Sequence, residues 1–331
     1  MGTVRAPGPW RVAMARLARN PSAWAASALL LAIVSLCLMA PLYVEHVTGV
    51  DPFQSNIEGT VAIYGQVRNL LEPNTEGLGI GSTPIGPTWN PALYFLGADA
   101  QGRDVAGRLL YGGRNSLLIG AAATVITLAL ACFVGIAAGY FGGVTDTIIS
   151  RGLDVLWAFP VYLLAISLSI VLLSGGFEIG PFTLTAGSLW LPIWIVGIVY
   201  VPYVARPIRG RVLTLRESEF VLASICLGVP PHRILLRDIL PNVATTVIVF
   251  APLMMALSVL AESALSFLSI GVQPPEASWG TIIQDGLELL YSRPTVVLAP
   301  GVALGLTVLA LNVLGEALRE AIDPRAKLRV A

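Results

Sequence analysis

The chain alternates between long apolar stretches and shorter segments that hold most of its charged side chains. A helix needs roughly 20 apolar residues to cross the hydrocarbon core of a membrane. Six stretches reach or approach that length, so the pattern predicts six transmembrane helices in an all-α integral membrane protein. Their expected ranges are 23–44, 115–138, 152–174, 187–205, 243–271 and 295–316.

The first apolar stretch, 23–44, has to be compared with a signal peptide, because Arg5, Arg11, Arg16 and Arg19 precede it. It is longer than the apolar part of a signal peptide, which spans roughly 7–15 residues, and no small-residue cleavage site follows it. We therefore expect an uncleaved first helix behind an N-terminal segment, 1–22.

Composition and charge agree with a membrane protein and predict its orientation. Hydrophobic residues make up 55% of the chain and charged residues 12%, about half the charged share of a soluble domain. Fifteen of the 20 lysines and arginines fall in segments that share a side with the N-terminus. Cytoplasmic loops carry such an excess, so we expect both termini, including the tail 319–331, in the cytoplasm. The zero net charge gives no sign of nucleic-acid binding.

The segment 45–113 would then lie on the external side of the membrane. It is rich in glycine, proline and asparagine, and its first part is acidic. One part of it, 77–91, carries turn residues without periodicity, so we predict no secondary structure there. The segment forms either a small cap or a tether. The other five helices form a core over 114–318.

The cytoplasmic segment 206–242 is longer than a connector between two spans needs to be. Residues 217–226 favour a short helix, which Gly228 and the two prolines after it should end. A second short helix over 232–240 should follow and should end at Pro241.

One face of the first short helix carries small and apolar side chains flanked by arginines. This face consists of Phe220, Ala223, Ser224 and Leu227. Such a surface can dock into a groove of another protein, or it can pack only against its own bundle. The residues alone leave both interpretations open.

The same segment resembles the EAA loop of ABC importer permeases, in which a glutamate, two small residues and a glycine precede a Leu-Pro-Asn ending. The stretch SEFVLASICLGVPPHRILLRDILPN matches this loop at Glu219, Ala223, Ser224, Gly228, Leu240, Pro241 and Asn242. It departs from the usual pattern at Ser224, where alanine is usual, and at Ile225 and Cys226, where Arg-Ala is frequent.

Three further segments resemble signatures of dipeptide and oligopeptide permeases, in the same order. They are LGADAQGRDVAGRLLYGGRNSL at 96–117, GYFGGVTDTIISRGLDVLWAFP at 139–160 and ESALSFLSIGVQPPEASWG at 262–280. Together the matches cover most of 96–325. By this resemblance the chain is identified as a member of the dipeptide, oligopeptide and nickel permease family, as a C-type subunit.

The resemblance implies six transmembrane helices of the ABC type I importer permease fold, with a long external loop after the first helix. It also implies a homologous permease as pore partner, two ATPase subunits below, and an external substrate-binding protein above, in a bacterial inner membrane. The residues that it assigns to ATPase coupling are Glu219, Phe220, Ala223, Ser224, Leu227 and Gly228. The implied cargo is di- or oligopeptides, with nickel complexes and glycosides as alternatives.

We expect no catalytic residue and no cofactor on this chain itself. Its only lysine, Lys327, is not part of a glycine-rich phosphate-binding loop, so ATP and Mg²⁺ would bind to the partner ATPases. The two histidines, His46 and His232, are predicted on opposite sides of the membrane and form no metal site. A secondary transporter driven by an ion gradient is the rival class, but the inverted repeats and midplane acids that it favours are not evident.

Two acidic residues lie inside predicted helices and are candidates for a gate or a pathway. An ionised carboxylate in hydrocarbon costs about 2.5–3.5 kcal/mol, so Glu262 should face protein or water. It is either a pathway or gate residue or a structural hydrogen-bonding group. Asp154 poses the same question, and Arg151 on the adjacent turn is its expected partner.

Prolines and glycines within the spans predict local geometry. Pro160 and Pro202 each remove a backbone donor and can bend a helix. Gly135 and Gly139 allow another helix to approach closely.

Overall fold

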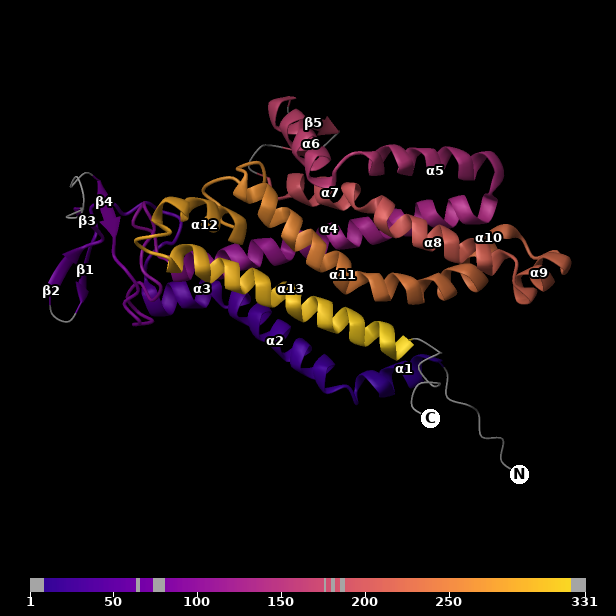
Figure 1. Cartoon of the computed structure of the whole chain (residues 1–331), viewed down its shortest axis with the longest axis horizontal. Coiled ribbons are helices and arrows are strands. Elements are labelled where there is room, and N and C mark those ends of the chain that lie inside the picture. Colours follow the sequence, from indigo (N-terminus) through magenta and orange to yellow (C-terminus); the bar gives the residue numbers. More distant parts are fainter. Residues whose placement is uncertain are drawn as a thin grey trace.

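The computed structural model describes residues 9–63, 66–73, 81–175, 177–179, 182–184 and 188–322. Most helices run along one long axis, with small β-hairpins at one end and short helices at the other (Figure 1). We call these the strand end, made of the described residues of 44–117 and of 262–294, and the α9 end, made of 217–239 and named after the short helix α9 (Glu219–Cys226).

Parts of three predicted segments fall outside the described residues. The N-terminal segment 1–22 is described from Pro9 onward, and the tail 319–331 is described up to Ile322, so Lys327 lies outside. Residues 77–80 of the predicted turn-rich stretch also lie outside.

Within the described residues, four helices are long and apolar enough to cross a membrane. They are α2 (Pro21–Leu38), α4 (Val105–Phe141), the continuous run Pro231–Phe267, and α13 (Thr295–Ile322). Two bent pairs pass the same test only together, namely α5 (Gly143–Ala158) with α6 (Val161–Gly175) and α7 (Trp190–Val199) with α8 (Val201–Arg216). If each pair is one span, the count rises to six, as the apolar pattern predicts.

The remaining elements are short and lie mostly at the two ends. Near the N-terminus they are α1 (Pro9–Leu17), α3 (Ala40–Tyr43), and the π-helical turn η1 (Val44–Thr48). The strands are β1 (Thr60–Ile63), β2 (Gln66–Asn69), β3 (Leu71–Pro73), β4 (Ser82–Pro84), β5 (Phe177–Ile179) and β6 (Phe182–Leu184). The α9 end holds α9 (Glu219–Cys226), α10 (Pro231–Ile234), and η2 (Leu235–Ile239), which leads into α11 (Leu240–Phe267). The strand end also holds α12 (Trp279–Asp285) and η3 (Leu287–Leu289).

The predicted bends at two prolines are confirmed. The chain between α5 and α6 turns by 91° at Phe159 and Pro160, and Phe159 is extended, with φ −88° and ψ 137°. A residue before proline avoids the helical region, which explains the break. Pro202 lies in the first turn of α8, just after the 42° bend, where a missing N–H leaves no helical bond unmade.

Helix α4 is the central element of the bundle and packs against α2, α7, α8 and α11. Its predicted glycine contacts are confirmed. A Cβ atom built on Gly135 would lie 2.8 Å from the carbonyl oxygen of Ala205, and one on Gly139 would lie 2.7 Å from Cβ of Val212. The two glycines therefore let α8 approach α4 at backbone distance.

The described residues of the segment 45–113, which we expect on the external side, fold as a small ordered cap. Strands β1 and β2 pair antiparallel, as do β3 and β4, and both hairpins enclose a separate apolar cluster. The buried members of this cluster are Val61, Leu70, Ile85, Tyr94 and Ala98. Strand β4 lies inside 77–91, where we predicted no secondary structure, so that prediction is wrong for Ser82–Pro84. The positions of β3 that pair with it lie 9 to 13 positions earlier, and turn chemistry alone does not specify such a pairing.

Candidate functional site

Helix α9 is a short, separately closed element of the α9 end. It ends in a Schellman motif, because the Gly228 N–H donates to the Ile225 carbonyl at 2.9 Å and the Val229 N–H donates to the Ser224 carbonyl at 3.0 Å. Gly228 has φ +74°, a conformation that side-chain-bearing residues rarely adopt. A Cβ atom there would meet nothing within 4 Å, so the requirement for glycine is conformational.

Most side chains of α9 point away from the rest of the protein. Val221 is the only fully buried residue of the helix and joins the main apolar core. Phe220, Leu222 and Ile225 are each nearly half exposed, and Leu227 is 82% exposed. Exposed apolar side chains therefore occur on more than the one face that we predicted.

The structure places the predicted coupling residues together on this projecting helix and its closing turn. Glu219, Phe220, Ala223, Leu227 and Gly228 are exposed, and Ser224 is half-buried. The Ser224 hydroxyl lies 3.2 Å from the Asp238 carboxylate of η2 and 3.1 Å from the Phe220 carbonyl oxygen. The sequence did not identify Asp238 as a partner of this helix. The available signal was Ser224, a polar residue at a position where the family usually has alanine.

The second short helix does not end at Pro241, and that prediction is wrong. Helix α10, the π-helical turn η2 and α11 form one continuous run, Pro231–Phe267. Pro241 lies in the first turn of α11, directly after η2, where the absent N–H is tolerated. The segment that contacts α9 through Asp238 therefore belongs to the same continuous helical run as α11, which is long and apolar enough to cross a membrane.

Asp154 lies on α5 and pairs with Arg206 of α8 at 2.9 Å, so the expected pairing with Arg151 is wrong. Arg151 is three positions away on the same helix, whereas the arginine that reaches Asp154 comes from a helix that packs against α5. The Asp154 side chain is 55% exposed and that of Arg206 is 40% exposed. This candidate pathway residue therefore remains accessible in the isolated chain.

Glu262 is fully buried on α11 and accepts hydrogen bonds from serines. The Ser266 hydroxyl donates to it at 2.7 Å and the Ser263 hydroxyl at 3.3 Å. The hydroxyls of Ser116 on α4 and Ser278 beside α12 contact the same carboxyl group. Four serines thus surround one acid.

Three of these serines also accept backbone N–H groups. Ser266 Oγ accepts from Val272 N at 3.0 Å, Ser116 Oγ accepts from Trp279 N at 3.1 Å, and Ser278 Oγ accepts from Thr281 N at 3.3 Å. Each serine therefore links Glu262 to a backbone segment of the strand end. This arrangement favours the structural interpretation of Glu262 over exposure to a pathway.

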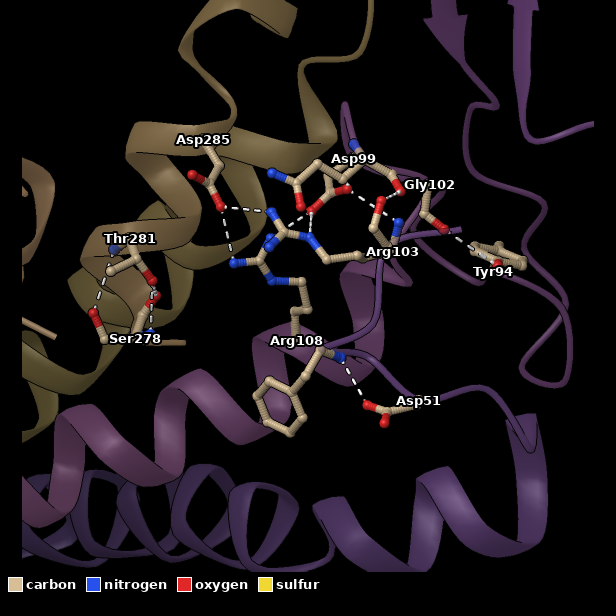
Figure 2. A network of polar contacts seen from close by, with 12 residues as sticks. Asp51, Tyr94, Asp99, Gly102, Arg103, Arg108, Ser278, Thr281 and Asp285 are labelled. Carbon is tan, nitrogen blue, oxygen red and sulfur yellow. Dashed lines mark hydrogen bonds and ion pairs between the residues drawn. The ribbon is translucent and has the colours of Figure 1, made fainter. Parts of the chain in front are cut away.

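A network of buried charges holds the strand end together (Figure 2). Arg103 contacts Asp99 at 2.7 Å and Asp285 at 2.8 Å. Arg108 contacts the same Asp99 oxygen, and it contacts Asp285 at 2.9 Å. Side chains of Asp99, Arg103 and Arg108 are less than 10% exposed. The network joins the cap, the start of α4 and the end of α12. The sequence analysis used the stretch GRDVAGR, residues 102–108, only as part of a family motif and did not predict this network.

Asp104 caps the N-terminus of α4 beside this network. One oxygen of its carboxylate accepts from the Gly107 N–H at 2.7 Å, and the other has no hydrogen-bond partner among the described residues. Burial is the main cause that raises the pKa of Asp104 to about 6, and the Asp99 charge adds to it. Hydrogen bonds from the Gly107 and Ala106 N–H groups oppose that rise.

Metal binding finds no support in the part of the chain that the structure describes. No three His, Cys, Asp or Glu side chains come together there in a way that could hold an ion.

Two family models match the chain. Residues 131–328 match the family described as "Binding-protein-dependent transport system inner membrane component". Residues 8–57 match "N-terminal TM domain of oligopeptide transport permease C". The two matches lie at opposite ends of the sequence, on either side of the cap and of the first part of α4.

Curated relatives are similar over most of their length. The dipeptide transport system permease protein DppC of Alkalihalophilus pseudofirmus is 33% identical over 324 residues, which is 97% of this chain and 92% of that protein. The oligopeptide permease OppC of Haemophilus influenzae is 37% identical over 232 residues, 70% of each chain. The glutathione permease GsiD of Pectobacterium atrosepticum is 35% identical over 236 residues, 71% of this chain and 74% of that one.

Among solved structures, the inward-facing MetNI methionine ABC transporter is similar to this chain in fold. The TM-score is 0.51 and the identity 17%, over 65% of this chain and 96% of that one. At this identity the likeness concerns the fold of the helical core.

Proposed function

The chain belongs to the family of binding-protein-dependent transport system inner membrane components, and from this premise we propose that it is the permease subunit of an ATP-driven importer of short peptides. The permease role rests on the family and on the six-span helical fold. The cargo rests on the names of the relatives, which are permeases for dipeptides, oligopeptides and glutathione.

The observation that carries the coupling role is the exposed apolar surface of α9. Phe220, Leu222, Ile225 and Leu227 project from a helix that is attached to the bundle through a single buried residue, Val221. Exposed apolar groups that cluster on one element are typical of a docking surface for another protein. Of the two interpretations that the sequence left open, this geometry favours docking into a groove of a partner ATPase.

The same geometry supplies two routes by which a movement of α9 reaches the membrane helices. One route runs back along the chain, where the Ser218 N–H donates to the Leu215 carbonyl of α8 at 3.0 Å. The other runs from Ser224 to Asp238 and so into the continuous run Pro231–Phe267. ATP binding would close the ATPases, displace α9, and tip the bundle from inward-facing to outward-facing, because the two states offer different contacts.

We assign the other parts of the importer to partner chains. A homologous permease would complete the pore, two ATPase subunits would bind ATP and Mg²⁺ beneath α9, and an external substrate-binding protein would dock at the strand end. The chain would lie in a bacterial cytoplasmic membrane with both termini in the cytoplasm. This orientation puts most arginines inside and the acidic cap outside.

Asp154 is our candidate for a pathway residue, since it is accessible and charged on a bent span. We assign Glu262 a supporting role for a gate at the strand end, because its carboxyl group is fully buried among serines.

Uptake into vesicles tests the proposal. Vesicles that contain this chain, its partner permease, the ATPases and the binding protein should accumulate labelled di- to hexapeptides only with internal ATP. The paired variant Phe220→Ser, Leu227→Ser should abolish uptake and lower recovery of the ATPases with the permease. A control variant, Met14→Ser, changes an apolar residue outside α9 whose exposure lies between those of Phe220 and Leu227, and should leave both unchanged.

Three results would contradict the proposal in different ways. Uptake of nickel complexes or glycosides in place of peptides would contradict the proposed peptide cargo and leave the importer role standing. Uptake by this chain alone with a proton gradient would make it a secondary transporter. Normal ATPase recovery with the paired variant would remove the coupling role of α9.

A further inference from the structure

Two ion pairs join α5 and α8, and they differ in how firmly they are held. Arg209 grips both carboxylate oxygens of Asp146, with Nη2 2.6 Å from Oδ2, and Ser150 donates to the same carboxylate at 3.1 Å. Arg206 makes one contact with Asp154, at 2.9 Å, and both side chains are about half exposed. The first pair is a fixed structural contact, whereas the second can exchange its partners.

A row of aromatic side chains begins beside the second pair. The Arg206 guanidinium lies 5.1 Å from the ring centroid of Trp157, which is itself 42% exposed. Trp157 lies 6.0 Å from Tyr203, and Tyr203 lies 6.3 Å from Phe250, measured between ring centroids. A row of three rings from α5, α8 and α11 therefore ends beside the ion pair of Arg206 and Asp154.

The charged pair lies on helices of the two bent pairs. Both α5 and α8 belong to pairs that are long and apolar enough to cross a membrane only when each pair is taken as one span. Charged side chains in hydrocarbon cost several kcal/mol, so they face protein or water-filled cavities. Half of the surface of Asp154 and Arg206 is uncovered within the chain, and it therefore opens towards a water-filled space or a partner subunit.

We propose that Asp154, Arg206 and Trp157 form a transit site for short peptides, in which Arg206 binds the C-terminal carboxylate and Asp154 binds the N-terminal ammonium group. This inference rests on the proposed import of peptides. On binding, the single Asp154–Arg206 contact opens and two new ion pairs form, so every charge keeps an opposite partner. The rings of Trp157, Tyr203 and Phe250 provide surface for apolar side chains of the peptide.

The arrangement also restricts the ligand. The site needs one negative and one positive group a few bonds apart, which a short zwitterionic peptide has at any sequence. The rings present mostly apolar surface, and the Trp157 N–H and the Tyr203 hydroxyl are their only polar groups, so side-chain selectivity would be low. A permease that accepts many peptides from a binding protein needs a site of this kind.

Direct binding without the binding protein tests the site. The permease pair with its ATPases is reconstituted in nanodiscs, and binding of tritiated Ala-Phe is compared with its N-acetylated and its C-amidated forms. Masking either end should weaken binding by roughly tenfold or more, because each removes one charge-assisted contact. Arg206→Gln should bind the free and the C-amidated peptide equally and should still prefer the free peptide to the N-acetylated one. Asp154→Asn should bind the free and the N-acetylated peptide equally and should still prefer the free peptide to the C-amidated one.

Controls separate binding from folding. Arg206→Lys keeps the charge and should keep part of the preference for the free carboxylate. Arg211→Gln, an exposed residue on the same helix, should bind all three peptides like the unmodified chain. If Arg206→Gln does not assemble, the comparison of free and masked peptides on the unmodified chain still tests whether both peptide ends are bound.

Equal binding of free and masked peptides, or no binding at all, would overturn the site. The same holds if the variants keep the preferences of the unmodified chain, which is the outcome expected when the partner permease covers the pair. ATP-dependent uptake by the complete importer is measured in parallel. Absence of that uptake overturns the proposed function, whereas uptake without any dependence on these residues overturns the transit site alone.

Discussion

The strand end buries charged side chains, whereas the α9 end exposes apolar ones. At the strand end, Asp99, Arg103 and Arg108 are buried with their charges paired within the chain, and Glu262 is surrounded by serines. At the α9 end, apolar side chains such as Leu227 are left exposed around one buried anchor. Burying a charge is costly unless it is paired, and exposing apolar surface forgoes the hydrophobic gain. The strand end satisfies its buried charges within the chain, whereas the α9 end leaves apolar surface that the proposed partner ATPase would cover.

This comparison predicts where a substitution lowers the stability of the chain and where it lowers only coupling. Changes at the strand end should reduce the free energy of unfolding. Changes on α9 should leave it nearly unchanged and should act on transport.

The largest effect is expected for Asp99→Ala. It leaves Arg103 and Arg108 buried with one partner fewer, which should lower the free energy of unfolding by about 3–5 kcal/mol. Thermal unfolding in detergent measures the change. Glu316→Ala, which removes an exposed pair with Arg319 at 3.9 Å, is the matched control and should cost less than about 1 kcal/mol. Equal losses for both variants would contradict the contrast between the ends.

A smaller loss is expected for Glu262→Gln. The amide NH₂ group would face serine hydroxyls that already accept backbone N–H groups, so buried donors would compete for one acceptor. We expect a loss of about 1–3 kcal/mol in unfolding free energy. Glu288→Gln, at an exposed position of η3, is the control and should have no effect. Unchanged unfolding together with altered ATPase stimulation would instead make Glu262 a gate residue.

Gly228→Val should cost about 1–2 kcal/mol locally, because a side chain at φ +74° is strained. The strain should distort the turn after α9 and abolish uptake, while the chain still inserts and unfolds at nearly its usual temperature. Gly210→Val places the same side chain on α8, where a Cβ atom also meets open space but φ is ordinary. Normal uptake by the Gly228 variant would remove the turn from the coupling mechanism.

The smallest effect is expected from pH. Because burial raises the pKa of Asp104 to about 6, the stabilising contribution of its neutral form is complete below about pH 4 and is lost as the pH rises through 6. Asp99, Tyr43 and Tyr94 are the titratable groups that interact with it. The unfolding temperature should therefore fall between about pH 4 and 6 more in the unmodified chain than in Asp104→Asn. Parallel curves for the two would contradict this.

The sequence predicts features that depend on short stretches of chain. Span length, the bend at Pro160 and the turn at Gly228 follow from hydropathy and backbone conformation within a few residues. The proposed coupling residues came from a motif with fixed spacing, and all of them but the half-buried Ser224 are exposed.

Features that depend on distant chain segments escaped prediction. Arg103 and Asp285 are 182 positions apart, and their contact depends on where α12 packs. Asp154 was assigned to Arg151 because helical spacing favours local partners, whereas the approach of α8 to α5 supplies Arg206. The failure at Pro241 has another cause, since the π-helical turn before it accommodates a proline that would ordinarily end a helix.

The length of α4 has a mechanical consequence. Its 37 residues span roughly 55 Å at 1.5 Å per residue, well beyond the roughly 30 Å of a hydrocarbon core. It starts beside the charged network of the strand end, and its last turn is tied to Arg216 of α8 through the Tyr140 carbonyl oxygen at 3.2 Å. A rod that protrudes on both sides pivots where the bilayer holds it. In the proposed importer, a tilt of α4 imposed from the side of the ATPases would therefore move the start of α4, and the cap attached there, in the opposite direction.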